Sequence, residues 1–463
     1  MTEFEQQSQD NHLIPPDPVS FWAAFCFWLK LGFVSFGGPA GQIAIMHQEL
    51  VEKRRWLSEK RFLHALNYCM LLPGPEAQQL ATYIGWLMHR NWGGVVAGGL
   101  FVLPSLLILI GLSFIYIAYG HLSGIAGVLY GIKPAVTAIV IFAAYRIGSR
   151  ALKNWLLWTM SALAFLAIFL FDTPFPLIVL IAAILGAIGG RVAPQKFTTG
   201  GGHGSAKLSY GSALIDDDTP TPNHALFTWL GLAKVILAGA ILWGGAIGFL
   251  CARYGWDGAL TQMAWFFTKA ALLTFGGAYA VLPYVYQGAV EHYHWLTAHQ
   301  MIDGLALGET TPGPLIMVVT YVGFVAGWAK ELFGADHLFL AGAAAACVVT
   351  YFTFLPSFLF ILAGGPLVES THGNLKFTAP LTGITAAVVG VILNLAVFFA
   401  WHVFWQQGFA GAFDAISALI SLCAFLALIR YKVGVITVIA SCGGTGLLIS
   451  VIKIWLVQHG VVL

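Results

Sequence analysis

Apolar runs alternate with short polar stretches along almost the whole chain. A membrane-spanning helix needs about 20 predominantly apolar residues, and most of the runs approach or exceed that length. They lie at 20–46, 62–88, 92–118, 128–147, 154–171, 174–190, 226–251, 262–289, 300–327, 336–364, 378–401, 411–429 and 433–457. The pattern predicts an all-α fold with up to thirteen hydrophobic elements.

Composition places these elements in a lipid bilayer. The chain has 463 residues, of which 59% are hydrophobic and 9% are charged, and its mean hydropathy is +0.81. A soluble domain carries about 25% charged residues, so this chain cannot cover a water-facing surface. We predict a multi-pass protein of the inner (plasma) membrane, without a nucleic-acid partner. The composition is compatible with a monomer or a homo-oligomer.

Two polar segments interrupt the pattern. Residues 1–19 are polar and acidic and lack the basic region and cleavage site of a secretory signal, which predicts a polar N-terminal tail. Residues 193–225 contain Gly200-Gly201-Gly202 and Asp216-Asp217-Asp218, a composition typical of a flexible linker. The glycines do not form a phosphate loop, because no strand precedes them and no Gly-Lys-Ser/Thr follows.

The linker separates two halves with a repeated sequence. Gly37-Gly38 recurs as Gly276-Gly277, 239 residues later (276 − 37), and Pro73-Gly74-Pro75 recurs as Pro312-Gly313-Pro314 at the same offset. The same offset relates Lys30 to Lys269, Phe36 to Phe275, and Trp56-Leu57 to Trp295-Leu296. Further on, Leu355-Pro356-Ser357 echoes Leu103-Pro104-Ser105. The chain is therefore a tandem duplication.

The run at 226–251 has no counterpart in the first half. If both copies share one internal layout, this extra crossing inverts the second copy, and inverted repeats are common in secondary transporters. We divide the chain into a first transporter repeat at 20–192, a cytoplasmic linker at 193–225, an extra transmembrane helix at 226–251 and an inverted second repeat at 252–463.

Basic residues indicate how the broken elements are arranged, because Lys and Arg favour the cytoplasmic side of a membrane. If all thirteen elements crossed, the basic loop at 53–61 would face away from the one at 146–153. Suppose instead that the elements at 20–46, 62–88, 262–289 and 300–327 are re-entrant hairpins. Then only Arg253 and Lys330 remain outside. The charges favour nine crossings and four hairpins over thirteen crossings.

The four breaks form the predicted substrate site. Helix breakers within a membrane are tolerated only beside protein or a water-filled cavity, and repeated broken helices point to a transporter's binding site. A helix that begins there directs free N–H groups and its positive dipole end into the cavity, which suits an anion. The predicted uncharged ligands are Ser35, Gly37, Gly38, Gln42, Gly74, Gln78, Gln79, Gly276, Gly277, Thr310, Thr311 and Gly313. The alternative is that the glycines and prolines only permit kinks or close packing.

Four lysines fall within apolar runs, where a charge is costly. Lys133 and Lys234 lie near segment ends, so their amines can snorkel to water. Lys30 and Lys269 are repeat equivalents, seven residues before a Gly-Gly break. We predict that this pair lines the substrate path. The alternative is an interhelical salt bridge to an acidic residue near the breaks.

Two acidic residues lie beside the Pro-Gly-Pro motifs. Glu76 directly follows Pro75, and Glu309 precedes Pro312 by three residues. A carboxyl group in low dielectric is costly to ionise and can therefore exchange a proton. We predict proton coupling through Glu76, together with Glu309.

Other chemistry is not indicated. The six cysteines lie singly in or beside apolar runs, and the histidines at 292, 294 and 299 have no accompanying cysteine or carboxylate cluster. We predict no metal site, no disulfide framework and no cofactor. No hydrolase elbow, Walker loop or zincin motif occurs, which argues against an enzyme or an ATP-driven pump.

The residues around the breaks resemble the chromate ion transporter family, in particular its long bacterial members with two homologous halves. The resemblance lies in Phe33-Val34-Ser35-Phe36-Gly37-Gly38-Pro39 and in the stretch from Leu72-Pro73-Gly74-Pro75-Glu76 to Tyr83-Ile84-Gly85-Trp86. The second half agrees through Leu273-Thr274-Phe275-Gly276-Gly277 and Thr311-Pro312-Gly313-Pro314. It covers nearly the whole chain outside the N-terminal tail and the linker.

This resemblance implies an inner-membrane protein that exports chromate by the proton-motive force and confers chromate resistance. It also implies a topology in which all hydrophobic segments cross, unlike the four hairpins favoured by the charges. Sulfate has the same charge and tetrahedral shape, so sulfate or another divalent oxyanion is an alternative cargo. A membrane anion sensor that binds without transport is the alternative of another class.

Overall fold

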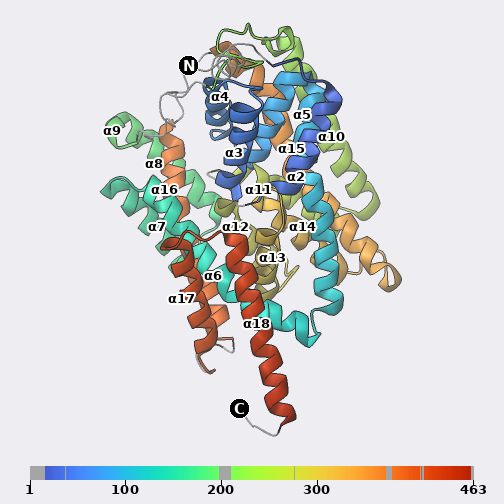
Figure 1. Ribbon diagram of the computed structural model, residues 1–463, viewed down its shortest axis with the longest axis vertical. Coiled ribbons are helices and arrows are strands. Elements are labelled where there is room, and N and C mark those ends of the chain that lie inside the picture. Colours follow the sequence, from blue (N-terminus) through green and yellow to red (C-terminus); the bar gives the residue numbers. More distant parts are fainter. Residues whose placement is uncertain are drawn as a thin grey trace, which may run out of the picture.

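The computed structural model is helical, and helices of its two halves interleave (Figure 1). It describes residues 16–36, 38–197, 210–275, 277–371, 378–406, 408 and 411–459. The predicted N-terminal tail and the glycine-rich part of the linker therefore lie largely outside the described residues. The helices of the first half are α2 (Phe21–Val34), α3 (Gly38–His47), η1 (Gln48–Lys53), α4 (Glu59–Cys69), α5 (Glu76–Tyr119), α6 (Ser123–Ala151), α7 (Trp155–Phe171), α8 (Phe175–Val192) and α9 (Pro194–Phe197).

The remaining helices follow the linker. They are η2 (Asn223–Ala225), α10 (Trp229–Tyr254), α11 (Ala259–Leu273), α12 (Ala278–Tyr286), η3 (Gln287–His292), α13 (Ala298–Thr310), η4 (Leu315–Met317), α14 (Val318–Ala329), η5 (Ala335–His337), α15 (Leu338–Thr371), α16 (Thr378–Phe404), α17 (Ala415–Ile429) and α18 (Val435–Gln458). Seven described helices are long and apolar enough to cross a membrane, and α7 and α17 are shorter apolar helices.

The broken elements of the first half are re-entrant. The ring of Phe21 at the start of α2 contacts that of His89, where a kink with non-helical backbone divides α5. Gly32 near the end of α2 packs on Leu100 of the same α5. The start of α2 therefore lies beside the start of the second part of α5, which follows the kink. The first part of α5, residues 76–88, must return from the break to the face from which α2 enters. The loop before α4 lies at this face too, since Ser58 N donates to Ile215 O of the linker at 3.1 Å. We call it the linker face.

The second half repeats this layout upside down. Its hairpin turn at 330–337 brings Gly327 of α14 against Ala341 of α15, as the first half brings Gly85 against Gly93. Figure 1 shows α3 and α4 above the breaks and α12 and α13 below them. The second set of hairpins thus enters from the opposite face, which we call the far face. The prediction of an all-α membrane protein with two halves is confirmed, and helices of both halves are broken at the predicted motifs.

The two halves interlock beyond the hairpins. Helix α6 packs against α17 and α18, and α16 packs in the same way against α7 and α8. Glycines allow the closest approach: a side chain at Gly131 of α6 would meet Cys442 O of α18, and one at Gly383 of α16 would meet Ala182 O of α8. Small residues permit such backbone contacts between membrane helices. Each half therefore supplies the packing surface for the end of the other.

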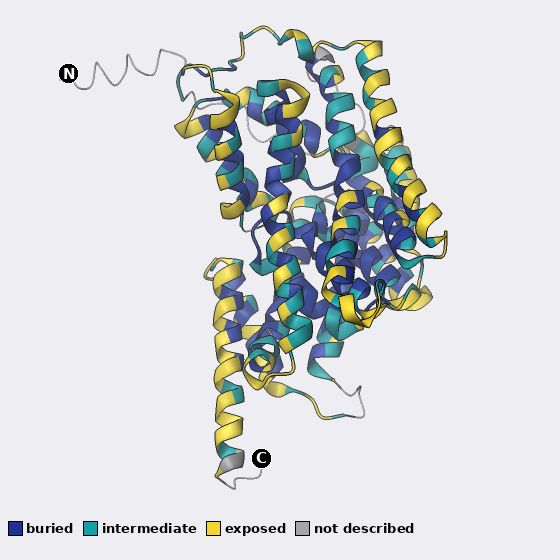
Figure 2. Cartoon of the chain, turned by 90° about the vertical axis from the view of Figure 1, so that its right-hand side faces the viewer, coloured by how far each residue is buried: buried dark blue, intermediate teal, exposed yellow. Residues whose placement is uncertain are grey.

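Helix α10 covers only the second half. It packs against α11 and α15, and the Trp243 indole donates to the Thr268 hydroxyl at 3.0 Å. In the first half the equivalent face of α2 has no covering helix among the described elements, and Trp22 on it is 70% exposed. Exposed residues cover the outer sides of the peripheral helices, whereas buried ones gather inside (Figure 2).

The described part of the linker is packed against the first half. Arg61 of α4 donates to the main-chain carbonyls of Asp216 and Thr219, and Ser58 donates to the Asp217 carboxylate. Leu57 and Ile215 pair through a short parallel bridge. The flexibility predicted for 193–225 is therefore not found at 210–225, because polar groups of the linker are satisfied by α4 and the loop before it.

Candidate functional site

The four breaks meet in two reciprocal pairs at the centre of the molecule. Gly74 N in the first Pro-Gly-Pro motif donates to Thr274 O beside the second Gly-Gly break, at 2.7 Å. Gly313 N in the second motif donates to Ser35 O beside the first Gly-Gly break, at 2.8 Å. Ser35 and Thr274 are repeat equivalents, as are Gly74 and Gly313. The breaks of one half therefore complete those of the other.

Only glycine fits at the central position of both Pro-Gly-Pro motifs. Their φ angles are +129° at Gly74 and +102° at Gly313, a region that side chains disfavour. A Cβ on Gly74 would lie 2.4 Å from the Ser357 hydroxyl, and one on Gly313 would lie 2.8 Å from the Cβ of Ser105. These serines belong to the repeated Leu-Pro-Ser motif, so each half's motif lines the other half's break.

Helices begin at the breaks, as predicted. Helix α3 starts at Gly38, α5 at Glu76 and α12 at Ala278, each within or directly after a break. The first N–H groups of such helices have no intrahelical carbonyl partner. Pro75 and Pro314 lie at the caps of the helices that follow, one position before the first helical residue. The positive ends of several helix dipoles therefore converge on one central region.

Three glutamines bring buried amide groups to the breaks. Gln42 donates to both Ser35 O and Gly313 O, Gln78 donates to the Thr82 hydroxyl, and Gln79 donates to Pro73 O. All three side chains are fully buried, yet the amide oxygen of each lacks a hydrogen-bond partner. A buried polar atom without a partner is costly. Each amide oxygen therefore has unused acceptor capacity beside a break.

The remaining uncharged candidates are only partly available. Ser35, Thr310 and Thr311 each donate their hydroxyl to a carbonyl of the preceding helix turn. Gly38 and Gly277 flank their breaks with φ of +68° and +100°, and nothing lies within 4 Å of a Cβ added there. Gly37 and Gly276 lie outside the described residues. The hydroxyl oxygens retain acceptor capacity, but their protons already have partners in this structure.

The two glutamates occupy different settings. Glu309 accepts a short hydrogen bond from the Tyr279 hydroxyl, and Arg146 of α6 lies close enough to Tyr279 to interact electrostatically. Glu76 is half-buried at the first position of α5. Arg146 was missed in the sequence because it belongs to a basic cluster that also fits a cytoplasmic loop.

The structure does not bring the two predicted lysines to the break cluster. Lys30 is exposed on the outer side of α2. Lys269 is half-buried, and its amine lies 5.8 Å from the Trp265 ring centre. Neither forms an ion pair or hydrogen bond within the described residues, so the alternative of a salt bridge is not seen either.

Two ion pairs between the halves were not predicted. Arg61 of α4 contacts Glu369 of α15 at 2.7 Å on the linker side of the breaks. Lys133 of α6 contacts Asp303 of α13 at 3.4 Å on the far side. Lys133 thus pairs with a carboxylate, where the sequence suggested snorkelling. No sequence signal joins these partners, because each pair connects residues from opposite halves.

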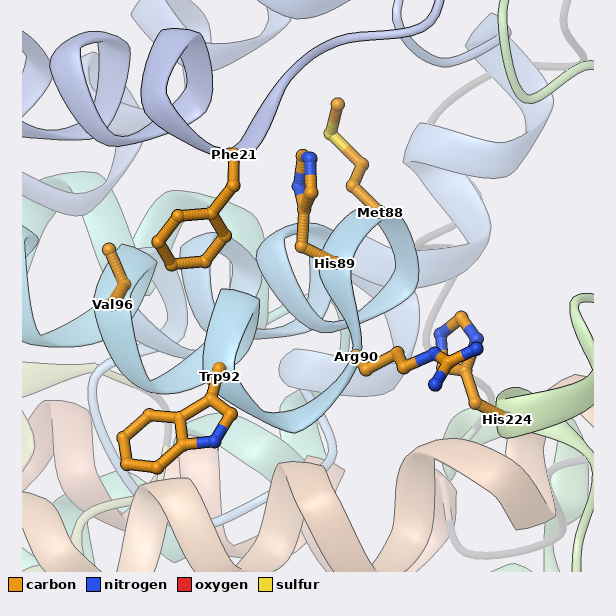
Figure 3. Close-up of a pocket in the computed structure, with 7 residues that line it drawn as sticks. All are labelled: Phe21, Met88, His89, Arg90, Trp92, Val96 and His224. Carbon is orange, nitrogen blue, oxygen red and sulfur yellow. The ribbon is translucent and has the colours of Figure 1, made fainter.

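A large cavity lies apart from the breaks. It measures about 880 Å³ at the linker face and is lined by Phe21, Met88, His89, Arg90, Trp92, Val96 and His224. Figure 3 shows Arg90 beside His224, with Trp92 on the other side. None of the predicted site residues borders it. In the described part of the chain, His, Cys, Asp and Glu form no group that could hold a metal ion.

Comparison with known proteins identifies the family. The sequence model of the chromate transporter family matches residues 22–187 and 261–447. The chain belongs to the chromate transporter family. The two matched regions are the two inverted halves, and the gap between them contains the linker and α10. Family and apolar helices together make it a multi-pass inner-membrane transporter protein.

Individual relatives are similar over most of their length. A chromate transport protein of Pseudomonas aeruginosa is 33% identical over 381 residues, covering 81% of this chain and 80% of the relative. One of Cupriavidus metallidurans is 29% identical over 408 residues, covering 88% and 87%. An uncharacterized transporter of Methanocaldococcus jannaschii is 26% identical over 385 residues, covering 82% and 85%. No solved structure matches the chain.

Proposed function

We propose that this protein is a secondary active transporter that exports chromate from the cytoplasm, driven by the proton-motive force. The observation that carries the proposal is the convergence of helix starts at the paired breaks. Helix N-termini offer N–H donors and a positive dipole end to an oxyanion. The names of relatives in the Pseudomonas and Cupriavidus lineages support chromate as cargo.

The anion would bind between the halves. Inverted halves allow one to rock against the other, which exposes a central site to each face in turn. The reciprocal bonds of Gly74 and Gly313 join the halves at this site, so a relative movement changes its shape directly. The expected chemical result is transport without modification of the cargo, and resistance follows from its removal from the cytoplasm.

Glu76 and Glu309 are the proposed proton carriers. Glu309 is held by the Tyr279 hydroxyl, and both carboxyls lie next to a break. Lys30 and Lys269 remain proposed path residues on the ground of their repeat equivalence. A local change in packing would be needed to turn Lys30 from the outer side of α2 toward the site.

Flux tests the proposal. Everted membrane vesicles containing the protein should accumulate labelled chromate when a pH gradient is imposed, and vesicles without the protein should not. Binding of chromate without accumulation would overturn transport and favour an anion sensor.

Competition defines the cargo in the same assay. If chromate is the cargo, a tenfold excess of sulfate should leave most of the accumulation intact. Efficient competition, together with accumulation of labelled sulfate, would instead assign sulfate or a general divalent oxyanion as the cargo.

A further inference from the structure

A second polar cavity lies between the halves on the far side of the breaks. It measures about 390 Å³ and is lined by residues from α5, α6 and α13, among them Tyr116, His121, Ala126, Lys133, Gln300 and Asp303. The far-face end of the cavity is reached through the α5–α6 turn, where His121 and Ala126 are exposed. Neither the break motifs nor the proposed central site accounts for it.

The lining of this cavity offers more hydrogen-bond donors than acceptors. Lys133, His121 and Gln300 can all donate into it, and Asp303 supplies the one acidic group among the lining residues. The Asp303 carboxylate accepts from Tyr116 at 2.9 Å and contacts the Lys133 amine at 3.4 Å. Lys133 has three N–H donors, and Asp303 is its only partner in the described structure. Its remaining donors are therefore available in the cavity.

The repeat-equivalent region on the linker side is filled by an ion pair and its hydrogen bonds. Arg61, the repeat equivalent of Gln300, contacts Glu369 and donates to two linker carbonyls, so each of its three guanidinium nitrogens has a partner. Tyr83, which aligns with Tyr321 once a gap of one residue is allowed, also donates to Glu369. The Arg61 side chain is 12% exposed, whereas that of Lys133 is 25% exposed. The same region of the repeat is thus sealed at one face and hollow at the other.

We propose that the far-side cavity is a binding station for a divalent tetrahedral oxyanion, with Lys133 as its cationic ligand. Asp303 holds the Lys133 amine until an anion replaces the carboxylate, so the ion pair between the halves opens as the anion occupies the station. This proposal rests on the proposed function, since it places a second anion site on the exit side of the central one.

The buried position of Asp303 makes this exchange costly, because a buried carboxylate that loses its cation is left uncompensated. Its side chain is 4% exposed, and its Oδ1 atom has no hydrogen-bond partner. When the Lys133 amine turns toward an anion, the Tyr116 hydroxyl still donates to Oδ2. The carboxylate therefore keeps one partner in both arrangements, which lowers the cost of opening the pair.

A thiol placed in the cavity can test the charge balance there. Ala126→Cys would be introduced after replacement of the six native cysteines, and right-side-out vesicles would be treated with methanethiosulfonate reagents. The rate for an anionic reagent (sulfonatoethyl) is divided by the rate for a cationic one (trimethylammonioethyl). Lys133→Met should lower this ratio about fivefold and Asp303→Asn should raise it about fivefold, the effect of one unit charge near the thiol. Lys234→Met, exposed on α10, is the matched control and should leave it unchanged.

Sulfate, a redox-inert dianion of the required shape, provides the occupancy test. It should slow labelling in the parent and more strongly in Asp303→Asn, but not in Lys133→Met. An unchanged ratio in Lys133→Met, or equal protection by sulfate in all variants, would overturn the station. Lys133→Arg keeps the charge and should behave like the parent, which separates a charge effect from misfolding. Labelling does not require flux, so vesicles that label as expected but do not accumulate chromate would overturn the proposed function alone.

Discussion

The two halves share their backbone at the breaks but not their side chains. Gly74 and Gly313 have the same left-handed geometry and the same hydrogen bond to the opposite half. The polar groups beside them have no repeat partner: Gln42 corresponds to Val281, Glu76 to Leu315 and Glu309 to Met70. Duplication therefore gives the two halves the same backbone geometry at their breaks. The polar side chains beside the breaks occur in one half only at each repeat position. A site built this way differs between its two approaches.

The two faces differ in the same sense. On the linker side, Arg61 and Glu369 are enclosed by the packed linker, whereas Lys133 and Asp303 border an open cavity on the far side. Both pairs join opposite halves, so both must change when the halves move. The ion pair on the linker side is therefore enclosed, whereas the one on the far side borders a cavity.

Valine at either central glycine should have the largest effect. Gly74→Val and Gly313→Val would each force a branched side chain into a positive-φ position and against a serine of the other half. Backbone strain of about 1–3 kcal/mol and overpacking of about 1–3 kcal/mol should abolish stable assembly and uptake. Thermal unfolding in detergent and vesicle flux measure this. Gly99→Ala is the control, because nothing lies within 4 Å of a Cβ there; a mild effect at only one of the two motif glycines would break the symmetry.

Loss of the repeat lysines should come next. We expect Lys30→Met and Lys269→Met to abolish chromate uptake while the protein still inserts, because a cation at this depth in both halves suggests a path for an anion. Immunoblots of membranes and flux assays check the two expectations. Intact uptake in both variants would remove the lysines from the path. Intact uptake in Lys30→Met alone would show that Lys30 lies outside the path, in agreement with its exposed position, and would leave Lys269 as the one path lysine of the pair.

Neutralising the glutamates should uncouple transport. Glu76→Gln cannot release a proton, so its uptake should lose the response to an imposed pH gradient, by about tenfold, a typical size for coupling between two sites. Glu309→Gln should show the same change if both residues carry the proton. Vesicle uptake with and without the gradient measures the ratio. Transport by Glu76→Gln that is still fully driven by the gradient would exclude this residue as the carrier.

A smaller effect should follow at Gln42. Its amide donates to Ser35 O and Gly313 O, so Gln42→Leu removes the donor to Gly313 O, while Ser35 O keeps the bond from Gly313 N. The expected cost is about 1–3 kcal/mol of unfolding free energy, seen as a lower midpoint in denaturant. Ile43→Leu, a volume-conserving swap at the neighbouring half-buried position, should cost less than about 1.5 kcal/mol. Equal losses would mean that packing, and not the amide, matters here.

The smallest effect concerns the helix that covers one half only. Trp243→Phe removes the hydrogen bond to Thr268 while it keeps an aromatic ring between α10 and α11. The expected loss is about 0.5–1.5 kcal/mol, because the Thr268 hydroxyl retains its bond to Ala264 O. Trp22→Phe on the uncovered α2 should be neutral in the same unfolding assay. A larger loss at Trp22 would indicate that another element or chain covers α2.

Much of the fold could be predicted because its signals are local or periodic. Apolar runs predicted the membrane helices, one constant offset revealed the duplication, and Lys and Arg in the loops indicated the re-entrant hairpins. Gly-Gly and Pro-Gly-Pro predicted where helices stop, since glycine and proline act on the backbone at their own positions. The motifs around them identified the family.

Contacts across the two halves depended on the tertiary structure alone. A repeat offset relates Gly74 to Gly313, but the partner of Gly74 is Thr274, and this follows only from the inverted orientation of the halves. The Lys133–Asp303 pair joins α6 to α13 for the same reason. Lys30 and Lys269 match in sequence, yet one is exposed and the other half-buried, because α10 packs on the second half only. The sequence determined where the helices break, because glycine and proline act at their own positions. The packing of the inverted halves decided which side chains meet at those breaks.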